Sequence, residues 1–160
     1  YILGFDRVKN LNTVSSTVKK NLSTYLSEYR IIGDTVTIKD GFVVNIGIDF
    51  EIIILPNFNS SEVISRCITE LQSYFNIDNR TFNQPILLKE LYINLDKING
   101  VQTVKDIQIT NKTGVSLGYS EYAYDITGAT QDNIIYPSLD PCVFEVKYPN
   151  TDIRGRAVSL

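Results

Sequence analysis

Two carboxylates on one strand come nearest to a catalytic spacing. Asp49 and Glu51 are separated by one residue in the run FVVNIGIDFEIIIL, so they lie on the same face of a predicted β-strand. Such a pair can act as general acid and base when its two pKa values are pushed apart. On the solvated face of a sheet, however, the same spacing is typical of exposed spacer residues, and we interpret the pair in that way.

The residue types that other common chemistries need are absent or isolated. The sequence has no His, which excludes Ser-His-Asp and Cys-His sites within this chain. Cys67 and Cys142 are far apart in the chain, and we expect two reduced, unreactive thiols. The stretch 76–80 resembles a calcium loop but has Thr81 where Gly is required, and no glycine-rich phosphate motif occurs. The sequence therefore predicts no catalytic site, no cofactor and no metal.

Length and charge limit the partners. A chain of 160 residues with a net charge of -3 predicts one domain without the clustered Lys and Arg that bind phosphates. The longest apolar run, residues 52–55, is too short to span a bilayer. We therefore expect neither a nucleic-acid nor a membrane partner. Because Met is absent and the chain opens on Tyr1, we expect an excerpt of a longer polypeptide.

Apolar spacing predicts the elements of the first third of the chain. Steps of three and four indicate an amphipathic helix over 11–29, capped by Asn12 or Thr13. Residues 35–39 are predicted to form a strand, and the Asp40-Gly41 pair predicts a hairpin turn into a long strand. One face of that long strand is wholly apolar, and we expect it to be buried; it comprises Phe42, Val44, Ile46, Ile48, Phe50, Ile52 and Ile54.

Two more helices are predicted downstream of the long strand. Asn59 can cap a helix over 63–75, with Glu62 three residues later. Cys67 lies on the apolar stripe of this helix, so we interpret it as a core residue. Pro85 suits the first turn of another helix.

A bulged strand completes the predicted domain. Gly100 suits the end of the preceding helix, and residues 101–109 follow as a strand. Val101 and Val104 are out of phase with one another, which indicates a β-bulge. The element order predicts an α+β domain in residues 1–111, with helices packed on a small, mostly antiparallel sheet.

The remainder of the chain has a different character. Residues 112–160 are rich in Gly, Tyr and Pro and predict an extended, loop-rich arm with one strand, CVFEVKYP. That strand has apolar residues on both faces, and the domain upstream can cover only one of them. We therefore expect the arm to pack on the domain and on a partner chain. The candidate interface residues are Tyr136, Val143, Phe144, Val146, Tyr148, Arg154 and Arg156, with the two arginines either pairing with carboxylates across an interface or solvated.

Several stretches resemble a known family. The runs VSSTVKKNLSTYLSEYRIIGDTVTIKDGFVVNIGIDFEIIIL, SSEVISRCITELQSYF and LLKELYINLDKINGVQTVKDIQI are similar to the C-terminal part of baseplate J-like proteins. The ending YPSLDPCVFEVKYPNTDIRGRAV resembles the C-terminal end of the large baseplate wedge subunit of contractile-tailed phages. The resemblance implies a structural, non-enzymatic protein that is made in the bacterial host cytoplasm and located in the virion. Copies would associate as homodimers or higher oligomers, bind other wedge subunits, and join wedges into a ring around the tail hub.

Two other functions compete with this reading. A surface adhesin would use Tyr119, Tyr122 and Tyr124 to bind glycan and would need them in a shared open groove. A small enzyme would need Asp49 and Glu51 together in a deep pocket.

Overall fold

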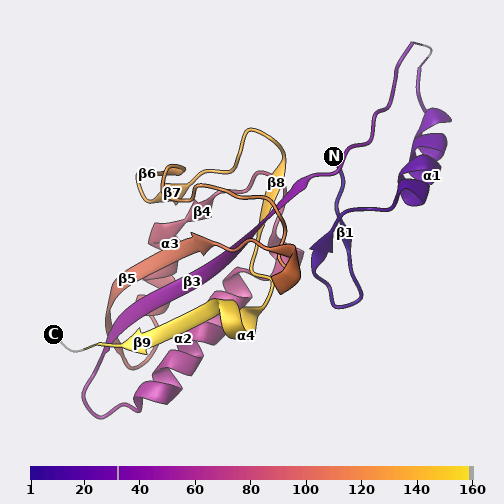
Figure 1. Ribbon diagram of the computed structural model, residues 1–160. Coiled ribbons are helices and arrows are strands. Elements are labelled where there is room, and N and C mark those ends of the chain that lie inside the picture. The colour runs from indigo at the N-terminus through magenta and orange to yellow at the C-terminus, as the bar shows by residue number, and fades with distance from the viewer. Residues whose placement is uncertain (32, 159–160) are drawn as a thin grey trace.

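The computed structural model describes residues 1–31 and 33–158 and has the predicted α+β class (Figure 1). Its helices are α1 (Ser16–Ser27), α2 (Ser60–Tyr74), α3 (Leu88–Asp96) and α4 (Pro149–Asp152), with short 3-10 turns η1 (Ile77–Asn79) and η2 (Val115–Leu117). Its strands are β1 (Gly4–Phe5), β2 (Leu11–Asn12), β3 (Phe42–Ile54), β4 (Ile86–Leu87), β5 (Val101–Asn111), β6 (Thr130–Gln131), β7 (Ile134–Ile135), β8 (Cys142–Glu145) and β9 (Ile153–Ala157).

Strand β3 is the centre of the main sheet. It pairs with β5 antiparallel along one edge, and with β8 and β9 parallel along the other. Two register shifts interrupt the β3–β5 ladder, which confirms the predicted bulge. The main sheet is therefore mixed, whereas the two smaller sheets, β1–β2 and β4–β7–β6, are antiparallel.

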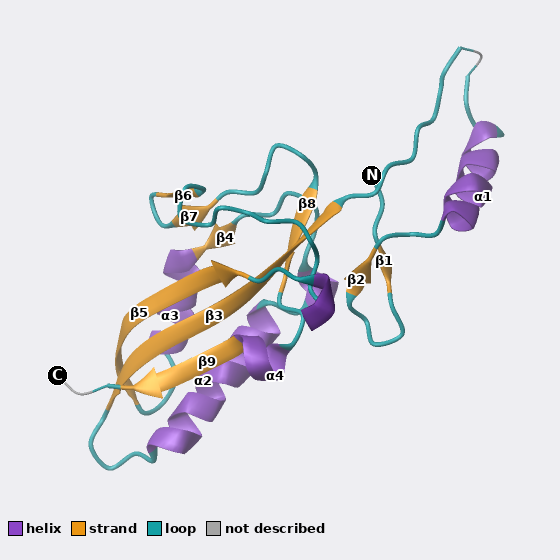
Figure 2. Cartoon of the chain, viewed as in Figure 1, coloured by secondary structure: helices purple, strands orange, loops and turns teal. Residues whose placement is uncertain are grey.

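The predicted apolar face of β3 forms the core except at its two ends, where Phe42 is 37% exposed and Ile54 is half-buried. Ile46, Ile48 and Ile52 are completely buried, and Phe50 is 1% exposed. Helices α2 and α3 lie together on this side of the sheet (Figure 2). They contribute Val63, Cys67, Leu71, Leu91 and Leu95 to the same cluster.

Helix α2 begins as the sequence predicts. The Asn59 side-chain oxygen accepts hydrogen bonds from the backbone N–H groups of Ser61 and Glu62, at 3.0 and 3.3 Å. Cys67 is completely buried on this helix, and burial raises the pKa of its thiol to about 11. Cys67 and Cys142 are both buried, free thiols.

Residues 112–160 differ from the predicted arm. They supply β8 and β9 to the main sheet, together with the short strands β6 and β7, instead of a single strand on an extended segment. Pro149 opens α4, a four-residue turn that leads the chain from β8 back along β3 as β9. Both sides of position 111 therefore contribute to one sheet.

The opposite face of β3 is also partly covered. The segment after β5 crosses it, and Ser120 donates hydrogen bonds from its N–H to Asn45 Oδ1 at 2.7 Å and from its hydroxyl to the Val43 carbonyl at 2.6 Å. Asn45 is 1% exposed as a result. Farther along the strand, Asp49 is exposed.

Three local predictions need correction. The first helix is shorter than 11–29, because Leu11–Asn12 pairs with β1 and Ser15 is the N-cap. Residues 35–39 form no hairpin with β3, because β8 pairs with that end of β3 instead. The third helix begins at Leu88 and not at Pro85, since residues 86–87 pair with β7.

Candidate interaction surfaces

The N-terminal projection, residues 1–31 and 33–41, extends away from the main sheet (Figure 1). Helix α1 has no buried residue. Its Lys19 forms an ion pair with Asp40, within the projection itself. A helix of twelve residues is marginal in water unless its apolar face is covered. This part of the molecule therefore lacks the packing that stabilises α2 and α3.

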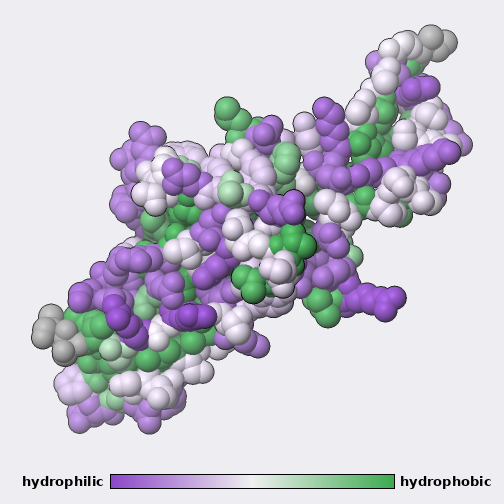
Figure 3. Space-filling view, viewed as in Figure 1, coloured by the Kyte–Doolittle hydropathy of each residue, from purple (hydrophilic) through white to green (hydrophobic). Residues whose placement is uncertain are grey.

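The apolar stripe of α1 is largely open to solvent. Tyr25 and Tyr29 are 57% and 71% exposed, and their rings contact one another at a tilt of 53°, with centroids 5.1 Å apart. Val18, on the same stripe, is also exposed. Hydrophobic residues are visible on the surface of the projection in Figure 3. An exposed apolar stripe on a projecting helix is typical of a protein-binding surface.

The chain returns from α1 through an extended segment. Residues 34–39 have no sheet partner among the described residues, although Val36 and Ile38 alternate with threonines as in a strand. The return path is anchored at its end, where the Ile2 N–H donates to the Lys39 carbonyl at 2.9 Å and the Gly41 N–H donates to the Ile2 carbonyl at 3.0 Å.

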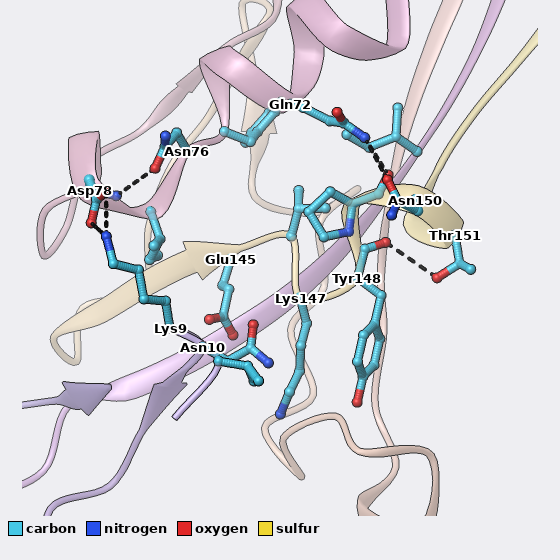
Figure 4. Close-up of a pocket in the computed structure, with 16 residues that line it drawn as sticks. Lys9, Asn10, Gln72, Asn76, Asp78, Glu145, Lys147, Tyr148, Asn150 and Thr151 are labelled. Carbon is cyan, nitrogen blue, oxygen red and sulfur yellow. Dashed lines mark hydrogen bonds and ion pairs between the residues drawn. The ribbon is translucent and has the colours of Figure 1, made fainter. Parts of the chain in front are cut away.

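A groove of about 810 Å³ lies where the projection meets the main sheet. Its walls come from the β1–β2 hairpin (residues 8–10), the end of α2 with the turn after it (72–78), and the segment that leaves β8 (145–151). Figure 4 shows side chains from all three walls, with the ion pair Lys9–Asp78 at 3.0 Å across one side.

A buried carboxylate joins the projection to the sheet beside this groove. Glu145 is 2% exposed, and its two oxygens accept hydrogen bonds from the Leu11 N–H at 2.6 Å and the Asn45 side-chain amide at 2.8 Å. Burial raises the pKa of the Glu145 carboxyl, and these two hydrogen bonds oppose the shift. The hydrogen bonds of this carboxyl group therefore connect the hairpin to the sheet. Polar residues at 45 and 145, inside apolar runs, were the signal that sequence reasoning missed.

The predicted interface residues fall into two groups. Val143, Phe144 and Val146 are 5%, 2% and 7% exposed, so the prediction that one face of this strand lies uncovered in the single chain is wrong. Phe144 and Val146 belong to the core cluster, and the segment that crosses the opposite sheet face near Val43 covers the other side. Tyr136, Tyr148, Arg154 and Arg156 are exposed.

The two arginines of β9 lie beside the carboxylates of the opposite sheet face. A groove of about 330 Å³ is lined by Asp49, Glu51, Arg154 and Arg156, together with residues of β5. Arg156 forms an ion pair with Glu51, which Lys105 also contacts at 3.6 Å. The bond from Arg156 is the main cause that lowers the pKa of the Glu51 carboxyl. Glu51 is therefore held as an anion, an arrangement that favours a surface ion-pair cluster over a proton donor.

The three tyrosines of the adhesin hypothesis make contacts within the chain. The Tyr119 hydroxyl donates to the buried Asp152 at 2.6 Å, and burial, followed by this bond, raises its pKa to about 12. Tyr122 stacks on Phe42 with centroids 4.6 Å apart, and the Tyr124 hydroxyl donates to a backbone carbonyl at 2.6 Å. Neither groove described above is lined by these three residues.

Within residues 1–31 and 33–158, no group of three or more His, Cys, Asp or Glu has the arrangement of a metal site. None of the helices in these ranges has the length and hydrophobicity needed to cross a bilayer. Comparison of the chain with protein-family models and with curated proteins gives no match.

Proposed function

We propose that this chain is a structural subunit of a phage tail baseplate, the self-association region of a wedge subunit that joins wedges into a ring around the tail hub. The observation that carries the proposal is the N-terminal projection, whose helix α1 has an apolar stripe and no buried residue. A projecting helix of this kind is suited to binding a neighbouring subunit, because its packing is incomplete in the single chain. The resemblance of the sequence to baseplate J-like proteins supplies the cellular context.

The partners proposed are further copies of this chain and other wedge subunits, and the location proposed is the virion. The ion pairs around Glu51 and the internal use of Tyr119, Tyr122 and Tyr124 favour this function over an enzyme or a glycan-binding adhesin.

Self-association is tested by replacing exposed residues of α1. The double variant Tyr25→Ser/Tyr29→Ser should weaken association measured by analytical ultracentrifugation by at least about tenfold, because two large side chains leave the contact. The melting temperature should stay nearly unchanged, since both side chains are exposed. The matched control is Thr17→Ser/Lys20→Ser, which changes exposed polar residues of the same helix.

Virion location is tested separately by mass spectrometry of contractile-tailed particles from a culture that produces this chain. Its peptides should co-sediment with tails. A wild-type protein that stays monomeric at all accessible concentrations, or peptides found only outside the particles, would contradict the respective part of the proposal.

A further inference from the structure

The edge of β8 is open where the chain leaves the sheet. The Phe42 N–H donates to the Pro141 carbonyl at 2.8 Å, and Phe42 is in register with Cys142. Successive residues of a strand turn their backbone N–H and C=O groups alternately toward and away from the neighbouring strand. Since the Pro141 carbonyl faces β3, the N–H and C=O of Glu145 also face β3, and those of Val146 face away from it. Within the described residues, no hydrogen bond is made to the N–H or carbonyl of Val146. Val146 lines the groove between the hairpin and the sheet, so this open edge belongs to the groove wall.

The projection contains a segment that could form a strand but is not paired in a sheet. Residues 34–39 have the alternation and the β-branched content of a strand but no sheet partner among the described residues. Val36 and Ile38 are only half-buried there. One chain thus contains a strand-forming segment without a sheet and a sheet edge without its next strand.

The charges of the two regions are complementary. Lys147 lines the groove beside Val146, and Asp34 lies exposed at the start of the unpaired segment. Among the described residues, neither takes part in an ion pair within the chain. Apolar groove residues, among them Phe75, Ile77 and Ile153, can receive the side chains that Val36 and Ile38 present on one face.

The connection is long enough for the segment to reach another molecule. About seven residues separate Asp34 from Gly41, where the projection joins β3, and an extended chain of that length spans roughly 23 Å. The β1–β2 hairpin, itself part of the projection, forms one wall of the groove. Two copies can therefore exchange segments symmetrically, each filling the groove of the other.

We propose that residues 34–39 of one copy add as a β-strand to the Val146 edge in the groove of a second copy, with Asp34 placed against Lys147. Strand addition to an open sheet edge is a common mode of peptide recognition, in which main-chain hydrogen bonds give affinity and side-chain pockets give specificity. This inference rests on the proposed self-association and adds a second contact to the one proposed for the stripe of α1.

Charge reversal tests the pairing. Asp34→Lys and Lys147→Asp should each raise the dimer dissociation constant about fivefold or more, measured by analytical ultracentrifugation, and a mixture of the two variants, or the doubly substituted chain, should recover wild-type association. Glu121→Lys is the control, because Glu121 is exposed, lies outside the groove and makes the same change in net charge as Asp34→Lys.

Cross-linking tests the proximity. A tagged Thr35→Cys chain mixed with an untagged Lys147→Cys chain and treated with a short bismaleimide should give a mixed dimer; Thr69→Cys, on the exposed side of α2, should not replace Lys147→Cys. The native thiols give little background because both are buried. A wild type that associates without charge rescue and without the mixed dimer overturns this inference and leaves the proposed function standing. A strictly monomeric wild type overturns the inference and the proposed self-association together.

Discussion

Truncation of Ile48 to Ala is the sharpest test of the core assignment. Ile48 is completely buried on the central strand, in register with Ile109 on one side and Ile153 on the other. Removing three carbons forfeits about 2.4 kcal/mol of transfer free energy at about 0.8 kcal/mol each. The cavity left between two strands and two helices cannot collapse freely, so we expect a total loss of about 3–4 kcal/mol in the free energy of unfolding.

The loss is measurable by urea denaturation followed by circular dichroism. For a chain of this length, each kcal/mol lowers the melting temperature by about 2–4 °C, so the expected decrease is roughly 6–16 °C. Ile48→Asp should lower the free energy of unfolding further, because an unpaired charge would enter the core. The neighbouring Asp49→Ala is the matched control on the opposite, exposed face and should stay within about 0.5 kcal/mol of wild type. Near-wild-type stability of Ile48→Ala would refute the assignment of the two sheet faces.

Three further outcomes follow from particular contacts. Burial raises the pKa of the Glu145 carboxyl, so between about pH 4.3 and that raised pKa the folded chain holds a proton that the unfolded chain has lost. The free energy of unfolding should therefore decrease as pH rises through this range. Glu145→Gln should flatten this part of the profile of stability against pH, and an unchanged profile would contradict the burial of the Glu145 carboxyl. Gly155→Ala places a methyl group against the Phe50 ring and should cost about 1–3 kcal/mol in denaturant unfolding, whereas Arg154→Ala on the same strand should be nearly neutral. Phe144→Glu should unfold the protein and not merely dissociate it, since Phe144 is 2% exposed; a folded monomer, seen by circular dichroism with sedimentation, would restore the side chain to the interface.

The main sheet and the projection are stabilised by different interactions. The main sheet is held by apolar burial between β3 and the helices α2 and α3. The projection meets it through few polar contacts, notably the bond from the Leu11 N–H to Glu145 and the exposed ion pair Lys9–Asp78. Exposed pairs of this kind contribute little free energy. We therefore expect hydrogen exchange to be fastest in residues 1–31 and 33–41 and slowest in β3.

The sequence by itself determined the elements whose pattern is set by one buried face. The alternation of β3 and the three-and-four spacing of α2 record which side chains avoid water, so both elements, their core faces and the buried Cys67 could be predicted. The bulge in β5 was visible for the same reason, since Val101 and Val104 are both buried although their spacing is out of phase.

Tertiary structure alone decided which segments pair. Strand β9, IRGRA, carries two arginines and a glycine and has little strand character, yet the free edge of β3 recruits it, and Gly155 leaves room for Phe50. Residues 35–39 have the better strand sequence but no sheet partner among the described residues, because β8 already occupies the adjoining edge of β3. Edge pairing depends on hydrogen bonds between segments about a hundred residues apart, and local periodicity carries no record of them. The same long-range return of the chain buries Phe144, whereas helix α1 is left with no buried residue.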